Sequence, residues 1–132
     1  MAYIVSYQKF ITRDITKQLN APEESTELCA IDAVTYVSVP DDAPLSDDQP
    51  TKIVDTIQTV VMTDELRALI KSQSTHVQLI DERVKAKIAA RYSITDEIKQ
   101  LRSAPSNEFD EYSAYVESCR AWGQSQKLAL GL

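Results

Sequence analysis

The feature that most constrains this chain is a change in the spacing of its apolar residues near Thr63. Before Thr63, β-branched and aromatic residues lie close together between acidic, proline-containing loops, which is typical of strands. After Thr63, apolar residues recur every three or four positions, which is the period of an amphipathic helix. The sequence therefore predicts an α+β protein with a small antiparallel sheet followed by a helical half. We expect a β-rich region over residues 1–62 and a helical region over 63–132, together forming one domain with either one core or two loosely joined ones.

Four segments of the N-terminal region have strand character. The first is Tyr3–Ile11, which is rich in β-branched and aromatic residues. Glu27–Ile31 and Val34–Val39 flank a two-residue turn and predict a β-hairpin. Ile53–Met62 contains β-branched residues at alternating positions, so we expect a buried strand over most of it.

The C-terminal region predicts three to four helices, of which the last is the longest. Residues suited to begin or cap a helix stand at the start of each: Thr63, Ser74 or Thr75, Thr95 and Ser106. Pro105 is expected to end the third helix, because proline cannot continue the backbone hydrogen bonding.

Glycine is scarce in this chain, and its scarcity excludes several kinds of chemistry. The only two glycines are Gly123 and Gly131, both near the C-terminus. Phosphate-binding loops, dinucleotide-binding turns and nucleophile elbows all require glycines at fixed spacings within a short segment. None of these motifs occurs, so we predict a protein without a nucleotide cofactor.

The residues that most often carry catalysis or bind metals are few and far apart. His76 is the single histidine, and it lies near the start of the second predicted helix, where a surface or capping role is typical. Cys29 and Cys119 have neither metal-binding nor redox spacing, so we expect two free thiols. A nucleophile–base couple would require the fold to bring His76 to a cysteine, and no local motif supports it. The prediction is a non-enzymatic protein without a metal.

An acidic loop follows the predicted hairpin. Its densest carboxylate pairs lie within residues 41–48, between Pro40 and Pro50. Oxygen-rich loops can bind calcium, but this one lacks both the regular spacing of ligands and the glycine that a calcium loop requires. We expect a solvated loop, and whether it binds an ion is left open.

The distribution of charge bears on the partners. Residues 1–66 carry 12 acidic and 4 basic side chains, a net of -8, and residues 67–132 carry 8 and 10, a net of +2. The isoelectric point is near 4.7. Nucleic acid is therefore not the expected partner, because binding phosphates requires a basic face. Neither a membrane span nor a signal peptide is recognisable, which predicts a protein of the cytoplasm without membrane contact.

The last predicted helix carries a stripe of large side chains. Phe109, Tyr112, Val116, Cys119 and Trp122 follow one another at spacings of 3, 4, 3 and 3. Such a stripe is most often core. Tyr115 makes it broader than one neighbouring helix and a small sheet would cover. The predicted contact surface for another protein is therefore Phe109, Tyr112, Tyr115, Val116, Cys119 and Trp122.

Residues 63–132 resemble small proteins encoded in the tail modules of tailed bacteriophages, including Mu-like transposable phages. The resemblance is carried by Thr63–Arg67, Val77–Val84, Ala90–Ile98, Tyr115–Gly123 and Leu130–Leu132. It implies a non-enzymatic component of the tail tip, baseplate or fibre attachment, which binds other tail proteins or further copies of itself. It places the chain in the host cytoplasm during assembly and in the virion tail afterwards. The resemblance includes no catalytic motif, so it assigns no functional residue.

The sequence leaves two alternatives open. The first is a tail-fibre assembly chaperone, which would act by the same kind of protein binding without being retained in the virion. The second is a small DNA-binding regulator, suggested by the short capped helices and their basic residues. Acidic residues are interleaved with those basic ones, which is more typical of charge pairing on a solvated helix.

Overall fold

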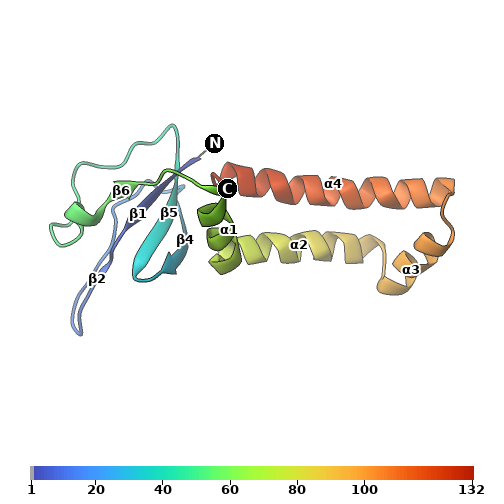
Figure 1. Ribbon diagram of the computed structural model, residues 1–132, viewed down its shortest axis with the longest axis horizontal. Helices are drawn as coiled ribbons and strands as arrows, with labels where there is room; N and C mark the ends of the chain where they lie inside the picture. The colour runs from blue at the N-terminus through green and yellow to red at the C-terminus, as the bar shows by residue number, and fades with distance from the viewer. Residues whose placement is uncertain (1) are drawn as a thin grey trace. The chain divides into compact units, whose positions relative to one another are not determined.

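The computed structural model describes residues 2–132 and has an α+β fold, as the sequence predicts (Figure 1). The four-stranded sheet is antiparallel and has the strand order β4-β5-β1-β6. Its strands are β1 (Ala2–Tyr7), β4 (Thr26–Ile31), β5 (Val34–Pro40) and β6 (Gln58–Thr59). A separate two-stranded hairpin consists of β2 (Phe10–Ile11) and β3 (Thr16–Lys17).

The β4–β5 hairpin has the two-residue turn expected from the sequence. Asp32 and Ala33 occupy this turn with φ values of 50° and 69°. Positive φ at both central residues is the geometry of a type I′ turn, whose twist matches that of the strands it joins. Aspartate tolerates this conformation better than alanine does. The hairpin prediction is therefore confirmed.

Apolar side chains cover both faces of the four-stranded sheet. Neighbouring residues of β1 point to opposite faces, as in any strand, so Ile4 and Val5 belong to different clusters. The first cluster consists of Ile4, Leu28, Ile70, Val77 and Leu132. The second consists of Val5, Tyr7, Val37, Val39 and Ile53. The sheet is thus the central layer between helical and C-terminal residues on one side and loop residues on the other.

The last residues of the chain join the first of these clusters. Leu132 is only 5% exposed. Gly131 precedes it with φ of +85°, a conformation that favours glycine, and a Cβ there would lie 2.8 Å from the Ala2 carbonyl oxygen. Glycine therefore allows the C-terminus to pass close to β1.

Two of the predicted strands are shorter than expected. Tyr3–Ile11 is interrupted at residues 8–9, between β1 and β2. In Ile53–Met62 only Gln58 and Thr59 form β6, because a 3-10 turn (η1, Val54–Thr56) precedes them. The Pro50 carbonyl oxygen accepts hydrogen bonds from the N–H groups of Ile53 and Val54, each at 3.0 Å. The Thr56 hydroxyl donates to the Ile53 carbonyl oxygen at 2.6 Å and supports the turn. The alternation of apolar residues therefore predicted too long a strand, since the buried Ile53 directly precedes a 3-10 turn and is not part of a strand.

The C-terminal half contains four helices, the upper number that the sequence predicts. They are α1 (Asp64–Gln73), α2 (Thr75–Arg91), α3 (Ile94–Arg102) and α4 (Asn107–Ala129). The hydroxyl of Thr63 accepts from the Leu66 N–H, and that of Ser106 accepts from the Phe109 N–H, so both predicted caps are confirmed. Among the helices of residues 2–132, none is both long and apolar enough to cross a bilayer.

Helix α3 begins at Ile94, one residue before the predicted start at Thr95, and its cap is Ser93. The Ser93 hydroxyl accepts from the Asp96 N–H at 3.1 Å, and the Asp96 carboxylate accepts from the Ser93 N–H at 3.0 Å. This reciprocal arrangement is a capping box, which satisfies two backbone donors at the helix start.

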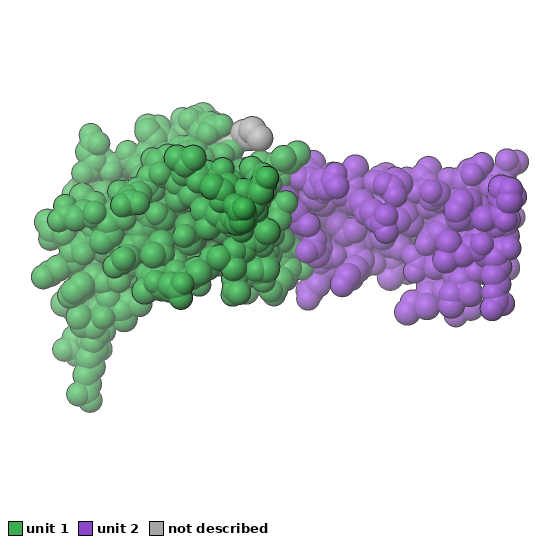
Figure 2. Space-filling model, in the orientation of Figure 1, with its two compact units in different colours: residues 1–78, 128–132 green, residues 79–127 purple. Residues whose placement is uncertain are grey.

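The chain forms two compact units, coloured separately in Figure 2. We call the part up to Gln78, together with Leu128–Leu132, the sheet unit. We call Leu79–Lys127 the helical unit. The sheet unit contains every strand and α1, and the helical unit contains α3 with most of α2 and α4.

In the helical unit, α2 and α4 run antiparallel, with α3 in the connection between them (Figure 1). Gly123 of α4 lies against α2. A Cβ at this position would lie 2.6 Å from Cγ2 of Val84 and 3.8 Å from Cγ2 of Ile80. The two helices therefore approach each other closely because residue 123 has no side chain.

Candidate interaction surface

The predicted contact stripe of α4 divides between the interior of the helical unit and its surface. Val116 and Cys119 are 9% and 4% exposed. They therefore belong to the packing of the unit itself. The other four members are half-buried and keep part of their rings exposed: Phe109, Tyr112, Tyr115 and Trp122.

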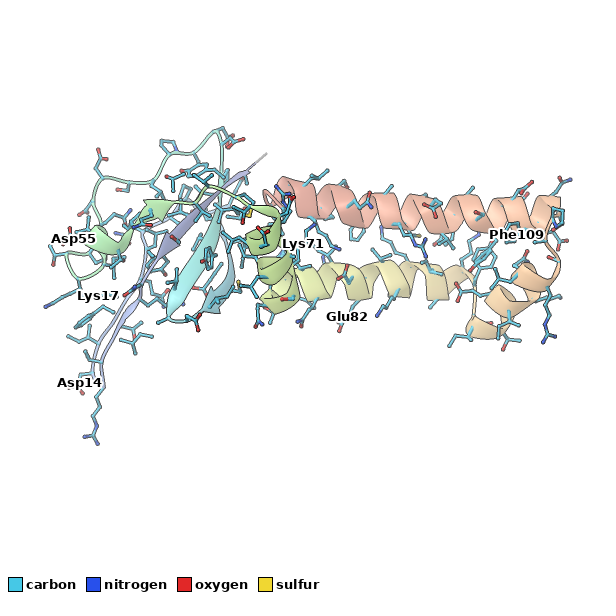
Figure 3. All side chains as sticks on the ribbon, viewed as in Figure 1. Asp14, Lys17, Asp55, Lys71, Glu82 and Phe109 are labelled. Carbon is cyan, nitrogen blue, oxygen red and sulfur yellow. The ribbon has the colours of Figure 1, made fainter. Side chains whose placement is uncertain are left out.

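Phe109 and Tyr112 belong to an aromatic cluster beside α3. The Tyr112 ring lies 6.3 Å from that of Phe109 and 5.0 Å from that of Tyr92, which it meets edge-on at 72°. The Tyr112 hydroxyl donates to Oε1 of Glu97 at 2.9 Å. Desolvation and this hydrogen bond raise the pKa of Tyr112 above its usual value. Figure 3 labels Phe109 at the start of α4, close to the turn that follows α3.

Tyr115 and Trp122 lie along one flank of the α2–α4 pair, under two cations of α2. The Nζ atom of Lys87 is 3.7 Å from the Trp122 ring centroid, and the Arg91 guanidinium is 4.7 Å from that of Tyr115. The Tyr115 hydroxyl donates to the Lys87 carbonyl oxygen at 2.7 Å. Desolvation, with a smaller contribution from Cys119, raises the pKa of Tyr115. We call Lys87, Arg91, Tyr115 and Trp122 the aromatic flank.

Elsewhere on the same two helices a cation is paired with a carboxylate and not with an aromatic ring. Lys127 forms an ion pair with Asp81 at 2.7 Å, which joins α4 to α2. Within the described residues, Lys87 and Arg91 form no ion pair with a carboxylate and have aromatic rings as their neighbours. The aromatic flank therefore offers two cations and two partly exposed rings to another molecule.

A second exposed apolar surface, on α3, was not predicted from the sequence. Ile94, Ile98 and Leu101 are 77%, 48% and 62% exposed. The half-buried side chains of the helix are instead polar, Glu97 and Gln100. We call Ile94, Ile98 and Leu101 the α3 stripe. Their spacing of four and three was a visible signal, but it could not tell a buried face from an exposed one.

The sheet unit exposes a smaller apolar site on the β2–β3 hairpin. Ile11 and Ile15 are both exposed. The Thr12 N–H donates to the Ile15 carbonyl oxygen at 2.8 Å and closes the turn between them. Figure 3 labels Asp14 at the far end of this hairpin and Lys17 on its returning strand.

The residues considered for catalysis or metal binding have ordinary surroundings. His76 is exposed on the first turn of α2. Cys29 is half-buried in β4 and Cys119 is buried in α4, and both are free thiols. Burial raises the pKa of Cys29, which favours the less reactive protonated form. Within residues 2–132, no group of three or more histidine, cysteine, aspartate or glutamate side chains is arranged to hold a metal ion.

Amide side chains hold the C-terminal end of the acidic loop. Its four aspartates, Asp41, Asp42, Asp47 and Asp48, are exposed. The Gln49 side chain accepts from the Asn20 N–H and donates to the Asn20 carbonyl oxygen, both at 2.9 Å. The Asn20 amide in turn donates to the carbonyl oxygen of Asp48 at 2.8 Å. These bonds hold the backbone of the loop at its end, near Asp48 and Gln49.

Comparisons with protein-family models, with curated proteins and with solved structures give no match to this chain. Its described surface offers two prominent apolar or aromatic sites on the helical unit, the aromatic flank and the α3 stripe. Exposed aliphatic groups, aromatic rings and nearby cations are the chemistry of contacts between proteins.

Proposed function

We propose that this chain is a non-enzymatic tail protein of a tailed bacteriophage. It would be a structural or accessory component of the tail tip, the baseplate or the fibre attachment, assembled in the host cytoplasm. The proposal is supported by the resemblance of residues 63–132 to small proteins of phage tail modules. The partners that it implies are other tail proteins and further copies of the chain.

The observation that carries a binding role is the exposed apolar and aromatic surface of the helical unit. Three aliphatic side chains of α3 lie largely in solvent, and Tyr115 and Trp122 are only partly covered. Tyrosine and tryptophan are enriched among the residues that contribute most to protein interfaces. A partner that covers these side chains would remove apolar surface from water, and each Å² buried would contribute about 25 cal/mol to the free energy of binding.

Analysis of finished particles tests the proposal. Virions of a phage that encodes the chain would be purified by density gradient and analysed by quantitative mass spectrometry. We expect the chain at a fixed ratio to the major tail proteins, and a soluble host enzyme measured in parallel gives the level of contamination. Recovery at only that contaminating level would contradict a role as a virion component.

A tail-fibre assembly chaperone is the second candidate, and the exposure of the α3 stripe in the free chain favours it. A transient factor must present its binding surface before its client arrives, and this surface requires no rearrangement to become accessible. It predicts a complex with the fibre protein in infected lysate and no chain in finished virions. Pull-down of tagged fibre protein, compared with the particle analysis, separates the two roles.

A DNA-binding regulator is less well supported by the charges. The isoelectric point is near 4.7, and the described basic side chains in ion pairs with acidic ones include Lys127 and Arg120. A gel-shift assay at low salt, where phosphate contacts are strongest, tests this role directly. We expect no retardation of DNA.

A further inference from the structure

We infer that the α3 stripe is a self-association surface, on which the α3 helix of a second copy packs in parallel. The inference concerns Ile94, Ile98 and Leu101, which are 77%, 48% and 62% exposed. It does not depend on the proposed role in a phage tail, because it follows from the geometry and charge of one helix.

The α3 stripe is free for a partner because the helix is attached to its own unit by a different side. At 100° per residue, the three aliphatic side chains lie within about 60° of one another around the helix. Glu97 and Gln100 lie on another side of the helix and are half-buried. Glu97 accepts a hydrogen bond from the Tyr112 hydroxyl at 2.9 Å. The contact with Tyr112 is therefore made away from the apolar side of α3, which remains exposed.

The helix is also well ordered at both ends by local hydrogen bonds. The capping box of Ser93 and Asp96 closes its start. At its end, the Ser103 N–H donates to the carbonyl oxygens of Lys99 and Gln100, each at 3.1 Å. A surface that is already fixed loses little conformational entropy when a partner binds.

The charges beside the stripe favour a second copy as the partner. Glu97 lies on one side of the stripe and Arg102 on the other, five residues further along. In a parallel pair of helices, a side chain at the position of Glu97 faces the position of Arg102 on the partner helix. Each Glu97 would then meet the Arg102 of the other copy, giving two attractive pairs. An antiparallel pair would instead place Glu97 against Glu97 and Arg102 against Arg102.

The area of the stripe sets the expected strength. Three aliphatic side chains bury less than the roughly 800 Å² per partner that is typical of a stable dimer. We therefore expect weak association, with a dissociation constant above about 10 µM. Such a contact becomes effective when several copies are held side by side, because the effective concentration is then high.

Sedimentation velocity over a range of concentrations tests the surface. The wild-type chain is expected to show a rising mean sedimentation coefficient between about 10 µM and about 1 mM. Ile98→Glu places a carboxylate at the centre of the stripe and should weaken association by about tenfold or more. The matched control is Leu79→Glu, which alters another half-exposed leucine, on α2, and should associate like wild type.

Charge reversal tests the parallel arrangement. Glu97→Lys and Arg102→Glu each place like charges together in a parallel pair, so each variant alone should associate less than wild type. An equimolar mixture of the two restores both attractive pairs and should associate again. Circular dichroism of each variant checks that α3 remains folded, since Glu97→Lys also removes the bond to Tyr112.

Three results would overturn the inference. They are a wild-type chain that stays monomeric at the highest concentration, an Ile98→Glu variant that associates like Leu79→Glu, and single charge reversals with no effect. None of these would bear on the presence of the chain in virions, so failure here is distinguishable from failure of the proposed function.

Discussion

The sheet unit and the helical unit protect their apolar residues to very different degrees. In the sheet unit, apolar layers cover both faces of the sheet, and Val5, Val39 and Ile53 have no exposed surface. In the helical unit, the clearly buried apolar side chains are those near the line of contact between α2 and α4, namely Ile80, Val116 and Cys119. A pair of helices has only one such line, so most of each helix surface faces solvent.

The difference teaches where stability and binding reside in this chain. Burial stabilises the sheet unit, whereas caps, hydrogen bonds and cation–π contacts contribute a larger share in the helical unit. Regions with few buried apolar contacts open more readily and commonly carry binding surfaces. The aromatic flank and the α3 stripe both belong to the helical unit. The following substitutions separate the two kinds of stabilisation.

The largest effect is expected from Leu28→Ala in the sheet unit. Leu28 is 2% exposed and lies in the cluster of Ile4, Ile70 and Leu132. Loss of the side chain should lower the free energy of unfolding by about 2–5 kcal/mol, because it removes apolar contacts and leaves a cavity. Urea denaturation followed by far-UV circular dichroism measures this change. The control is Leu69→Ala, which shortens a leucine on α1 that is 43% exposed and should cost less than Leu28→Ala does.

The next effect is expected from Gly123→Ala at the contact of α2 with α4. Alanine is a better helix former than glycine by about 0.5–1 kcal/mol, so propensity alone predicts stabilisation. The new Cβ would lie 2.6 Å from Cγ2 of Val84, and overpacking of this kind costs about 1–3 kcal/mol. We therefore expect a net loss of stability. Urea denaturation measures it through the fluorescence of Trp122, which is the only tryptophan and lies in the helical unit.

A double-mutant cycle identifies the clash as the cause. Val84→Ala removes the methyl group that the new Cβ meets, so the double variant should be more stable than the sum of the two single changes predicts. The control is Gln124→Ala, which introduces alanine at an exposed neighbouring position of the same helix. Stabilisation by Gly123→Ala alone would show that the helices can separate at no cost.

The elements of both units that local chemistry determines could be predicted from the sequence. The four helices follow from their period and from cap residues such as Thr63 and Ser106, whose hydroxyls bind backbone N–H groups three residues on. The β4–β5 hairpin follows from two strand-like segments joined by two residues. In each case the signal and the structure lie within a few residues of each other.

What depends on distant residues could not be predicted. The spacing of Ile94, Ile98 and Leu101 gives one apolar face, but only the position of α3 beside Tyr112 decides that this face is exposed. Likewise the α4 stripe gives no sign that Val116 is enclosed while Tyr115 remains at the surface. These outcomes follow from which helix packs against which.

A smaller effect is expected from Lys87→Met on the aromatic flank. The Lys87 ammonium lies 3.7 Å from the Trp122 centroid, and an exposed cation–π contact contributes about 0.5–1 kcal/mol. Methionine keeps an apolar stem of similar length and removes the charge, so the unfolding free energy should fall by about this amount. The control is Lys85→Met on the same helix, since no ring contact of Lys85 is present in the described structure. Equal losses in both variants would assign the effect to general charge.

The smallest effect is expected on acidification, at the capping box of α3. Hydrogen bonds from the backbone N–H and the hydroxyl of Ser93 lower the pKa of Asp96 below its usual value of 3.8. Since the folded pKa is depressed, the stabilisation is fully present above the ordinary value and is lost as the pH falls through the lowered one. We therefore expect the first turn of α3 to fray below about pH 4, as faster amide exchange at Ile94–Glu97. Asp96→Asn keeps an oxygen acceptor but cannot titrate, so the difference between wild type and this variant isolates the cap from the other carboxylates. Identical pH profiles would mean that α3 does not rely on this local contact, and the contrast between the two units would then be weaker than the geometry indicates.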